Sequence, residues 1–242
     1  ASLLSIDRGA LNITSTPKGL VAGLVTLHND KTQTFVDCSI LESAGFSIPG
    51  DLKQIESLSI DASSCDFILI VEKDAVFNKL IQERIWERYP CVVVTARGFP
   101  DLPTRAFLNR LASTGVQDTC KIYILVDWNP SGLWIFSTYV TGGASNTNES
   151  KRYALPNAIF LGVSHEDILA AGKVFTAKHT KREARDIANI LRRKRGPLYP
   201  TFKTELEQMH ALGRKCEIEG LYASKNDDNY ALSEYIRDKA YK

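Results

Sequence analysis

The stretch that decides the fold runs from Phe67 to Asp127 and reads FILIVEKDAVFNKLIQERIWERYPCVVVTARGFPDLPTRAFLNRLASTGVQDTCKIYILVD. It contains three short apolar runs, Phe67–Val71, Cys91–Thr95 and Ile122–Val126, and a helical pattern follows each of them. Continuous apolar strands that alternate with helices are typical of a parallel sheet covered on both faces. The central stretch therefore predicts an α/β fold with a parallel-sheet core.

The flanking segments differ from this core. On the N-terminal side, residues 11–14 alternate apolar and polar side chains, and residues 18–25 form a glycine-punctuated strand pattern. On the C-terminal side, helical patterns cover residues 180–195 and 201–217. We expect three parts: an N-terminal strand segment that packs on the core (1–62), the core domain (63–172) and a basic helical extension (173–242).

Composition narrows the class of protein. The 242 residues are 44% hydrophobic and 24% charged, which excludes wholesale disorder. No apolar run approaches 18 residues and the first residues do not resemble a secretory signal, so no membrane partner is expected. Five scattered cysteines indicate reduced, mostly buried thiols in a cytosolic or nuclear protein. Four isolated histidines give no zinc pattern, so a catalytic metal should be a hard ion such as Mg²⁺.

The charge is unevenly distributed. Residues 1–150 carry 12 Lys/Arg and 16 Asp/Glu, a balance of −4, and residues 151–242 carry 18 and 12, a balance of +6, which together give the formal +2. Nine basic side chains fall within 173–195: Lys173, Lys178, Lys181, Arg182, Arg185, Arg192, Arg193, Lys194 and Arg195. Such a cluster can attract nucleic-acid phosphates through counterion release, and a solvated helix face is the alternative.

Acidic side chains follow two of the predicted strands. Glu72 comes directly after the first strand, Asp127 follows the third, and Asn129 lies two residues further on. Ligands of open α/β sheets bind beyond the carboxyl ends of the strands. Two carboxylates and an amide oxygen there can hold Mg²⁺ with several waters retained. The alternative is that Asp127 simply caps the helix that starts near Pro130.

The second strand ends in a tight loop, Arg97-Gly98-Phe99-Pro100-Asp101. This loop would hold Phe99 near solvent, where an aromatic ring can stack on a base or wedge beside it. Arg97 and Arg105 would flank the site as phosphate contacts. The alternatives are inward packing for Phe99 and surface ion pairs for the two arginines.

These pieces together resemble a known family. Glu-Lys after one apolar strand, Gly-Phe-Pro-Asp-x-x-Thr-Arg after the next and Asp-x-Asn-Pro-x-Gly after the third look like the Rossmann-like Toprim domain. The chain as a whole resembles the topoisomerase VI A subunit family, and within it the eukaryotic meiotic DNA double-strand-break transesterases. This closer likeness involves Lys18-Gly19-Leu20, Leu161-Gly162, the helix from Thr180 to Arg193, and Tyr235-Ile236.

The resemblance implies a magnesium-dependent transesterase. In the family, a tyrosine attacks a DNA phosphodiester and becomes linked to the 5′ phosphate, and two protomers cut the two strands. The motif match makes Glu72 and Asp127 ligands of Mg²⁺, and it puts Asn129 where the family has a third acid. The implied partners are double-stranded DNA, a second protomer in a homodimer or a dimer of complexes, and B-subunit-like and other accessory meiotic proteins. The implied location is the nucleus, on chromosomes.

The family nucleophile belongs upstream of the Lys-Gly-Leu strand, and none of the nine tyrosines matches it. Tyr89, Tyr123 and Tyr139 fall in predicted strands or helices, where we expect them to pack in the core. The chain is therefore expected to bind DNA and Mg²⁺ without cleaving DNA by itself. The expected DNA contacts are Lys18, Lys73, Arg97, Phe99, Arg105, Lys178, Lys181 and Arg182.

Two other functions fit the same residues less well. Asn129 can mark a degenerate metal site in a non-catalytic dimerisation or assembly module. Another Toprim enzyme, such as a primase or a nuclease-like protein, is the third option, and the Gly-Phe-Pro-Asp-x-x-Thr-Arg match argues against it.

Overall fold

The chain divides into two units, one made of residues 1–123 and 138–159 and the other of residues 124–137 and 160–242. A computed structural model describes residues 16–29, 32–41, 45–143, 151–171, 176–193, 200–222 and 231–242. The strand predicted at residues 11–14 lies outside these ranges. Each unit is described by itself.

The first unit is built around two buried parallel strands. In β6 (Phe67–Val71) and β7 (Cys91–Thr95) every residue is buried, and the strands pair in parallel with Phe67 opposite Cys91. Burial on both faces explains why their sequences are continuous apolar runs. The predicted parallel core is confirmed here, with both strands at their predicted bounds.

Further strands extend this sheet on both sides. β1 (Leu20–Gly23) pairs antiparallel with β7, and β4 (Phe46–Ser47) pairs antiparallel with β1. β8 (Lys121–Leu125) lies next to β6, which gives the order β4-β1-β7-β6-β8. The sheet is therefore mixed, with its antiparallel part contributed by the N-terminal segment.

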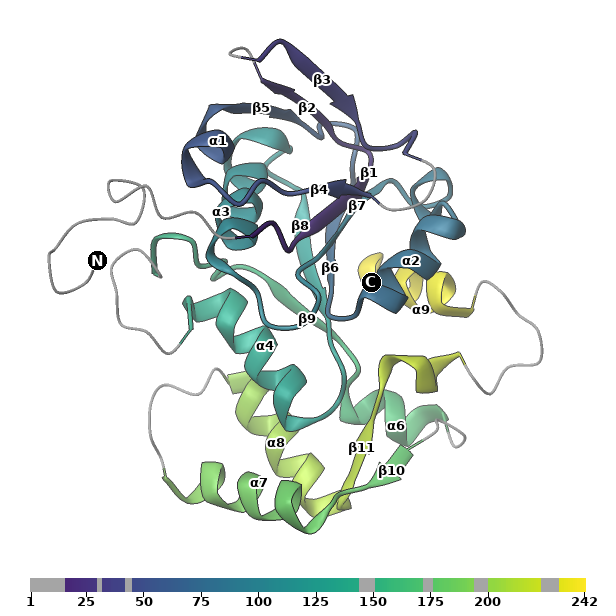
Figure 1. The fold of residues 1–242 in the computed structure, drawn as a ribbon. Helices are drawn as coiled ribbons and strands as arrows, with labels where there is room; N and C mark the ends of the chain where they lie inside the picture. The colour runs from purple at the N-terminus through teal and green to yellow at the C-terminus, as the bar shows by residue number, and fades with distance from the viewer. Residues whose placement is uncertain are drawn as a thin grey trace, which may run out of the picture. The chain divides into compact units, whose positions relative to one another are not determined.

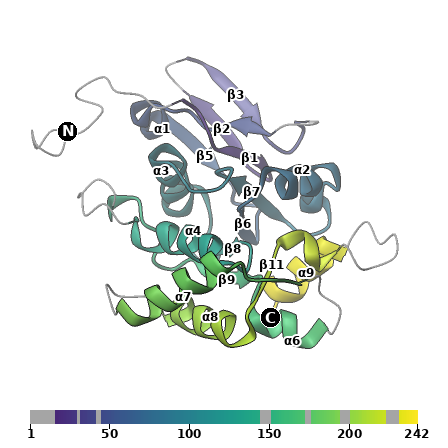
Figure 2. The same cartoon turned by 60° about the horizontal axis from the view of Figure 1, so that its bottom comes forward.

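Helices cover both sides of these strands. Figures 1 and 2 show α2 (Asp74–Gln82) and α3 (Leu102–Arg110) on opposite sides of β6 and β7. Helix α2 buries Val76, Phe77, Leu80 and Ile81, which is the spacing of one helical face. Ile85, expected on the same helix, lies instead in the short helix η3 (Ile85–Glu87), because the chain turns at Arg84 with a φ of 46°.

A second, smaller sheet completes the first unit. It has the order β3-β2-β5 and contains β2 (Thr26–Asn29), β3 (Thr34–Asp37) and β5 (Leu58–Asp61), all antiparallel. Before the core strands, residues 52–61 form α1 (Leu52–Ser57) followed directly by β5. In β5, Leu58 and Ile60 are buried and Ser59 and Asp61 are exposed, which is the period of two that a strand requires.

The second unit is rich in helices. Strand β9 (Ile159–Gly162) lies next to β8, and α7 and α8 lie side by side (Figure 2). The other elements with residues in this unit are α4 (Pro130–Thr141), α6 (His165–Ala171), β10 (Thr176–Lys178), α7 (Lys181–Arg193), α8 (Pro200–Leu212), β11 (Arg214–Cys216), η5 (Ile218–Leu221) and α9 (Ala231–Ala240). The short helix η4 (Leu111–Gly115) belongs to the first unit.

The helix expected over residues 201–217 ends earlier than its pattern predicted, and residues 214–216 form a strand. Helix α8 ends at Leu212, and Gly213 adopts a φ of +61° while its N–H donates to the carbonyl of Met209. A glycine in the left-handed region is a common helix terminator. The chain then forms β11, which pairs antiparallel with β10.

Two expectations from composition can be compared with the structure. Cys38, Cys65, Cys91 and Cys216 are buried free thiols and Cys120 is half-buried, which confirms mostly buried, unpaired cysteines. None of the described helices combines the length and the apolar character needed to cross a membrane.

Candidate metal and nucleic-acid site

The loop after β7 is fastened to the residue that follows β6. The N–H of Gly98 donates to the carbonyl of Glu72 at 2.8 Å, and the Nζ of Lys18 donates to the carbonyl of Phe99 at 2.7 Å. The structure therefore brings Glu72, Lys18 and the Phe99 loop together at the carboxyl ends of β6 and β7. Lys73 is half-buried, and its carbonyl accepts the first backbone bond of α2, from Phe77.

The conformation of the loop displays Phe99. Arg97 and Gly98 both have positive φ values, 54° and 96°, so the chain makes a tight reversal there. Pro100 is buried, whereas the Phe99 side chain remains 51% exposed. The alternative of inward packing for Phe99 is therefore wrong, and the ring is available to a ligand.

The two arginines near this loop differ. Arg97 is exposed, and its Nε donates to Asp74 Oδ1 at 3.0 Å, which is the surface ion pair considered from the sequence. Arg105 is only 6% exposed, and its Nη1 donates to the carbonyl of Gly142 at 2.9 Å. Helix α3 buries every residue from Pro103 to Leu108, so Arg105 takes part in packing in this structure, not in the exposed surface.

In the second unit, Asp127 is held in a buried loop. It is 4% exposed, and its Oδ1 accepts a hydrogen bond from the N–H of Ile218 at 2.9 Å. The adjacent Trp128 exchanges two backbone hydrogen bonds with Cys216, of 2.8 and 3.0 Å. The segment after β11 thus fixes the direction in which the chain leaves β8.

Asn129 caps the next helix. Its Oδ1 accepts a hydrogen bond from the N–H of Gly132 at 2.8 Å, and its carbonyl accepts one from Leu133 at 3.2 Å. The cap considered for Asp127 is therefore made by Asn129, with Pro130 at the first helical position. Its Nδ2 lies 3.4 Å from Asp127 Oδ2, so the donor end of the amide faces the carboxylate. A Cβ on Gly132 would collide with the carbonyl of Asp127, which explains the glycine of this motif.

Two of the three predicted metal ligands are of the kind that a hard cation binds. Mg²⁺ binds one or two carboxylates and keeps several waters. Glu72 and Asp127 supply carboxylates of this kind, and the side-chain oxygen of Asn129 is already engaged by the helix cap. Within the described residues, no group of three His, Cys, Asp or Glu side chains is arranged to hold a metal. Each of these carboxylates by itself can serve as one ligand of a hydrated ion, whereas the side-chain oxygen of Asn129 is occupied by the cap of α4.

The basic extension presents an exposed cationic surface. Lys178, Lys181 and Arg182 are all exposed, and β-sheet register sets Lys178 opposite Arg214, which is exposed too. Arg214 was not among the expected DNA contacts, because α7 and α8 separate β10 from β11 in the sequence and no local pattern indicates that the two strands pair. Lys173, Lys194 and Arg195 lie outside the described residues. We name Lys178, Lys181, Arg182 and Arg214 the basic strand-pair surface.

A capping box orders the start of α7. Glu183 Oε2 accepts hydrogen bonds from the N–H and the hydroxyl of Thr180, and Glu183 Oε1 pairs with Lys215 at 2.7 Å. Burial alone would raise the pKa of Glu183, but the hydrogen bonds from Lys215 and Thr180 outweigh it and lower the pKa to about 2.

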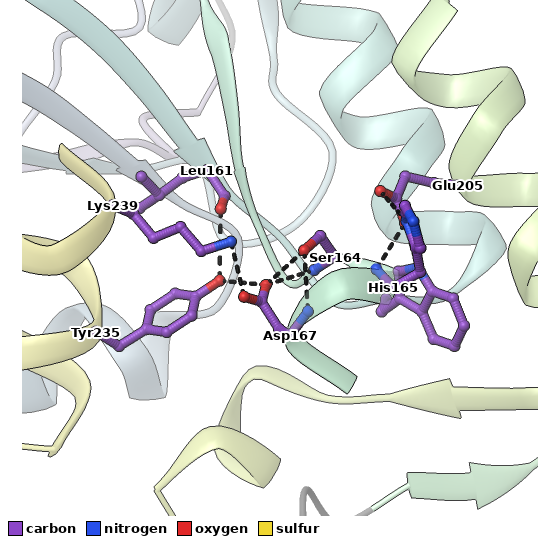
Figure 3. Close-up of polar contacts among 8 residues, drawn as sticks. Leu161, Ser164, His165, Asp167, Glu205, Tyr235 and Lys239 are labelled. Atoms are coloured by element: carbon purple, nitrogen blue, oxygen red, sulfur yellow. Dashed lines mark hydrogen bonds and ion pairs between the residues drawn. The ribbon is translucent and has the colours of Figure 1, made fainter. Parts of the chain in front are cut away.

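A second polar cluster joins α6, β9 and α9 (Figure 3). Asp167 Oδ2 accepts hydrogen bonds from the N–H and hydroxyl of Ser164 and from the hydroxyl of Tyr235, each at 2.8 Å, and Asp167 Oδ1 lies 2.7 Å from Lys239. Burial opposes ionisation of Asp167, but the hydrogen bonds from Lys239, Ser164 and Tyr235 prevail and lower its pKa. This cluster attaches the C-terminal helix to the end of β9.

Two of the three tyrosines that were expected to pack in the core are buried. Tyr123 and Tyr139 are 4% and 1% exposed, which confirms core packing for both. Tyr89 is half-buried, with the guanidinium of Arg88 above its ring. Burial raises the pKa of Tyr139 well above its ordinary value, so its hydroxyl stays protonated.

Comparison with known proteins gives a consistent result. The sequence model of the family described as the Toprim domain of Spo11 and of the topoisomerase 6 A subunit matches residues 67–240. Meiotic recombination protein SPO11-2 of Oryza sativa subsp. indica is 37% identical over 238 residues, which cover 98% of this chain and 59% of that protein. Meiotic recombination protein SPO11 of Mus musculus is 33% identical over 241 residues, covering 98% of this chain and 58% of that protein.

A topoisomerase component is also similar. The A3 subunit of DNA topoisomerase 6 of Oryza sativa subsp. indica is 35% identical over 166 residues, which cover 69% of this chain and 36% of that protein. The chain thus spans less than two thirds of the length of each of these relatives.

Proposed function

Because the chain belongs to the family of Spo11 and the topoisomerase 6 A subunit, with its Toprim, Rossmann-like fold, we propose that it is the Mg²⁺- and DNA-binding portion of a meiotic DNA transesterase of the type IIB topoisomerase class. In the proposed reaction a tyrosine hydroxyl attacks a DNA phosphodiester. A bond forms between the tyrosine oxygen and phosphorus, the bond from phosphorus to the 3′ oxygen breaks, and the hydroxyl proton ends on that 3′ oxygen. The product is a 5′-phosphotyrosyl link.

Metal binding is assigned to Glu72 and Asp127, with Asn129 acting through water because its side-chain oxygen caps α4. Bound Mg²⁺ would supply positive charge that offsets the charge of the phosphodiester. The protein's own contribution is to fix the backbone of Glu72, whose carbonyl accepts from the N–H of Gly98, and the carboxylate of Asp127, whose Oδ1 accepts from the N–H of Ile218.

The observation that carries the DNA assignment is the displayed Phe99. Its carbonyl is anchored by Lys18 while its side chain stays 51% exposed, two residues after the exposed Arg97, which pairs with Asp74. A fixed aromatic ring next to cationic groups suits stacking on a base or wedging between base pairs, with phosphates held alongside.

The basic strand-pair surface supports the same assignment in the second unit. Its exposed lysine and arginine side chains can follow a phosphate backbone without reading base sequence. The proposed partners are double-stranded DNA, a second protomer, and B-subunit-like and other accessory meiotic proteins. The proposed location is the nucleus, in association with chromosomes, as the meiotic names of the relatives imply.

The assignment of Phe99 is tested by DNA binding of the Phe99→Ala variant. Loss of one stacking contact, on the order of 1–3 kcal/mol, should weaken binding to a rhodamine-labelled duplex by about fivefold or more. Fluorescence anisotropy at fixed salt measures this. The control is Phe35→Ala, which removes another exposed phenyl ring, 66% exposed on β3 in the same unit.

Unchanged affinity in Phe99→Ala, or an equal loss in Phe35→Ala, would remove Phe99 from the DNA interface. A failure of the unsubstituted chain to bind any duplex would overturn the proposed function itself.

A second function is favoured by one observation. Residue 129 is an asparagine, so the second unit lacks the third carboxylate that the family motif has. The Oδ1 of Asn129 caps α4, and its Nδ2 faces Asp127. A non-catalytic assembly module with a degenerate metal site would look the same. It differs in that it binds no Mg²⁺, with or without DNA.

A further inference from the structure

His165 lies beside the loop that carries Asp127. The N–H of Val126 donates to the carbonyl of Gly162, and the N–H of Val163 donates to the carbonyl of Val126, both at 2.8 Å. The chain therefore leaves β8 and β9 at neighbouring points, and the residues that follow β9 lie next to those that follow β8. His165 is the third residue after β9, at the sheet edge where ligands of α/β proteins bind.

A buried carboxylate fixes the histidine ring (Figure 3). Glu205 on α8 is 4% exposed, and its Oε2 accepts hydrogen bonds from the indole N–H of Trp128 at 2.7 Å and from the backbone N–H of His165 at 2.9 Å. Its Oε1 lies 2.9 Å from His165 Nδ1. Glu205 accepts both of the N–H hydrogen bonds at Oε2, and with Oε1 also as an acceptor the Nδ1–H of His165 donates to it.

The second ring nitrogen of His165 has no such contact. Among the described residues no hydrogen-bond partner of Nε2 is present, and the side chain is 20% exposed. Trp128, which shares Glu205 with His165, directly follows Asp127 in the sequence. The pair of His165 and Glu205 therefore contacts the loop that contains the proposed metal ligand Asp127.

The surroundings of His165 are acidic. The acidic groups around it are Glu205 on α8, which it contacts, Glu166 and Asp167 on its own helix, and Asp127, which directly precedes the Trp128 that shares Glu205. Lys239 of α9 is already paired with Asp167 at 2.7 Å. A DNA phosphate that approaches this edge meets negative charge, and a protonated His165 is the cation that can offset it.

We propose that His165 is a DNA-backbone contact, in which an imidazolium oriented by Glu205 donates its Nε2–H to a phosphate oxygen. This inference rests on the proposed DNA-binding function and goes beyond it, because it names a contact that no family motif supplies. In the neutral ring, the Nδ1 proton faces Glu205 and Nε2 is an acceptor, which cannot donate to phosphate. The contact therefore requires a ring that carries a proton on both nitrogens.

Substitution of Glu205 tests whether His165 donates to DNA or only supports the fold. In Glu205→Gln the amide oxygen must accept from Trp128 and the His165 N–H, so the amide NH₂ turns toward Nδ1. The neutral ring then holds its proton on Nε2 and donates to phosphate without a second proton. Glu205→Gln should therefore bind DNA independently of the protonation of His165.

The experiment measures duplex affinity by rhodamine anisotropy at pH 6.0 and pH 8.0 and constant ionic strength. The unsubstituted chain should lose about fivefold or more in affinity across this range, as expected for loss of one charge-assisted hydrogen bond. His165→Ala should bind the duplex more weakly than the unsubstituted chain at pH 6.0. Its affinity should not show the fivefold loss between pH 6.0 and pH 8.0. Glu205→Gln should keep its affinity at pH 8.0. His210→Ala, which removes an exposed histidine of α8, is the control and should behave like the unsubstituted chain.

Circular dichroism checks that Glu205→Gln folds. If it does not, His165→Gln takes its place, because its amide also donates without titrating and should keep binding at both pH values. An identical pH dependence in His165→Ala and the unsubstituted chain would overturn the inference while leaving the proposed function intact. Absence of DNA binding by the unsubstituted chain would overturn the proposed function, and the inference with it.

Discussion

Single residues decide what each strand end offers to a ligand. Asn129 is a helix cap whose amide faces a carboxylate, and Phe99 is displayed because Lys18 and Glu72 hold the backbone around it. The sequence motif predicted an exposed Phe99 correctly, because Gly98 and Pro100 restrict the loop. It could not separate Arg97 from Arg105, because burial of α3 on all sides depends on segments distant in sequence.

Gly162 is a residue that packing makes indispensable. A Cβ there would collide with the hydroxyl of Tyr235, which donates to Asp167. We expect Gly162→Ala to lower the free energy of unfolding by about 2–3 kcal/mol in urea titrations.

The matched control for Gly162→Ala is Gly98→Ala. Gly98 also has a positive φ, 96°, but nothing lies within 4 Å of an added Cβ, so only backbone strain of about 1 kcal/mol is expected. The double variant Gly162→Ala/Tyr235→Phe should recover part of the loss. Equal losses in the two glycine variants would show that the contact with Tyr235 is unimportant.

At the scale of elements, buried strands were the easiest to predict and edge structure the hardest. β6 and β7 are continuous apolar runs, and only a strand buried on both faces has this pattern at this length. β11 is three residues long and contains two cations, so its sequence carries no strand signal. It forms because α8 ends at Gly213 and β10 offers backbone partners.

The start of α7 gives a pH prediction. The folded pKa of Glu183 is about 2, below the ordinary 4.5, so its ionised form stabilises the fold. This contribution is fully present above about pH 4.5 and is lost as the pH falls toward 2. Glu183→Gln keeps the acceptor for Thr180 but loses the charge that pairs with Lys215, and it should cost roughly 1 kcal/mol at pH 7.

Urea unfolding at several pH values checks this. The two proteins should differ at pH 7 and converge as the pH drops from 4.5 toward 2. A difference that persists unchanged at pH 2 would mean that charge at residue 183 contributes nothing.

At the scale of the whole molecule, the small net charge of +2 divides between the two parts of the sequence. The acidic part contains the proposed metal ligands Glu72 and Asp127, and the basic part contains the basic strand-pair surface. Composition alone could show this division, but it could not show that Arg214 joins Lys178, or that Glu205 orients His165. Both contacts join residues that lie more than 30 positions apart, and pairings over such separations leave no local pattern.

The central claim is that this chain binds Mg²⁺ through Glu72 and Asp127. The most direct measurement is isothermal titration calorimetry with Mg²⁺, in the absence and presence of duplex DNA. We predict saturable binding that Glu72→Gln or Asp127→Asn weakens about 10-fold or more, since each removes one of two carboxylate ligands. Asp118→Asn, which alters an exposed acid before β8, should leave it unchanged. Absence of binding under both conditions, or equal binding in all variants, would contradict the account.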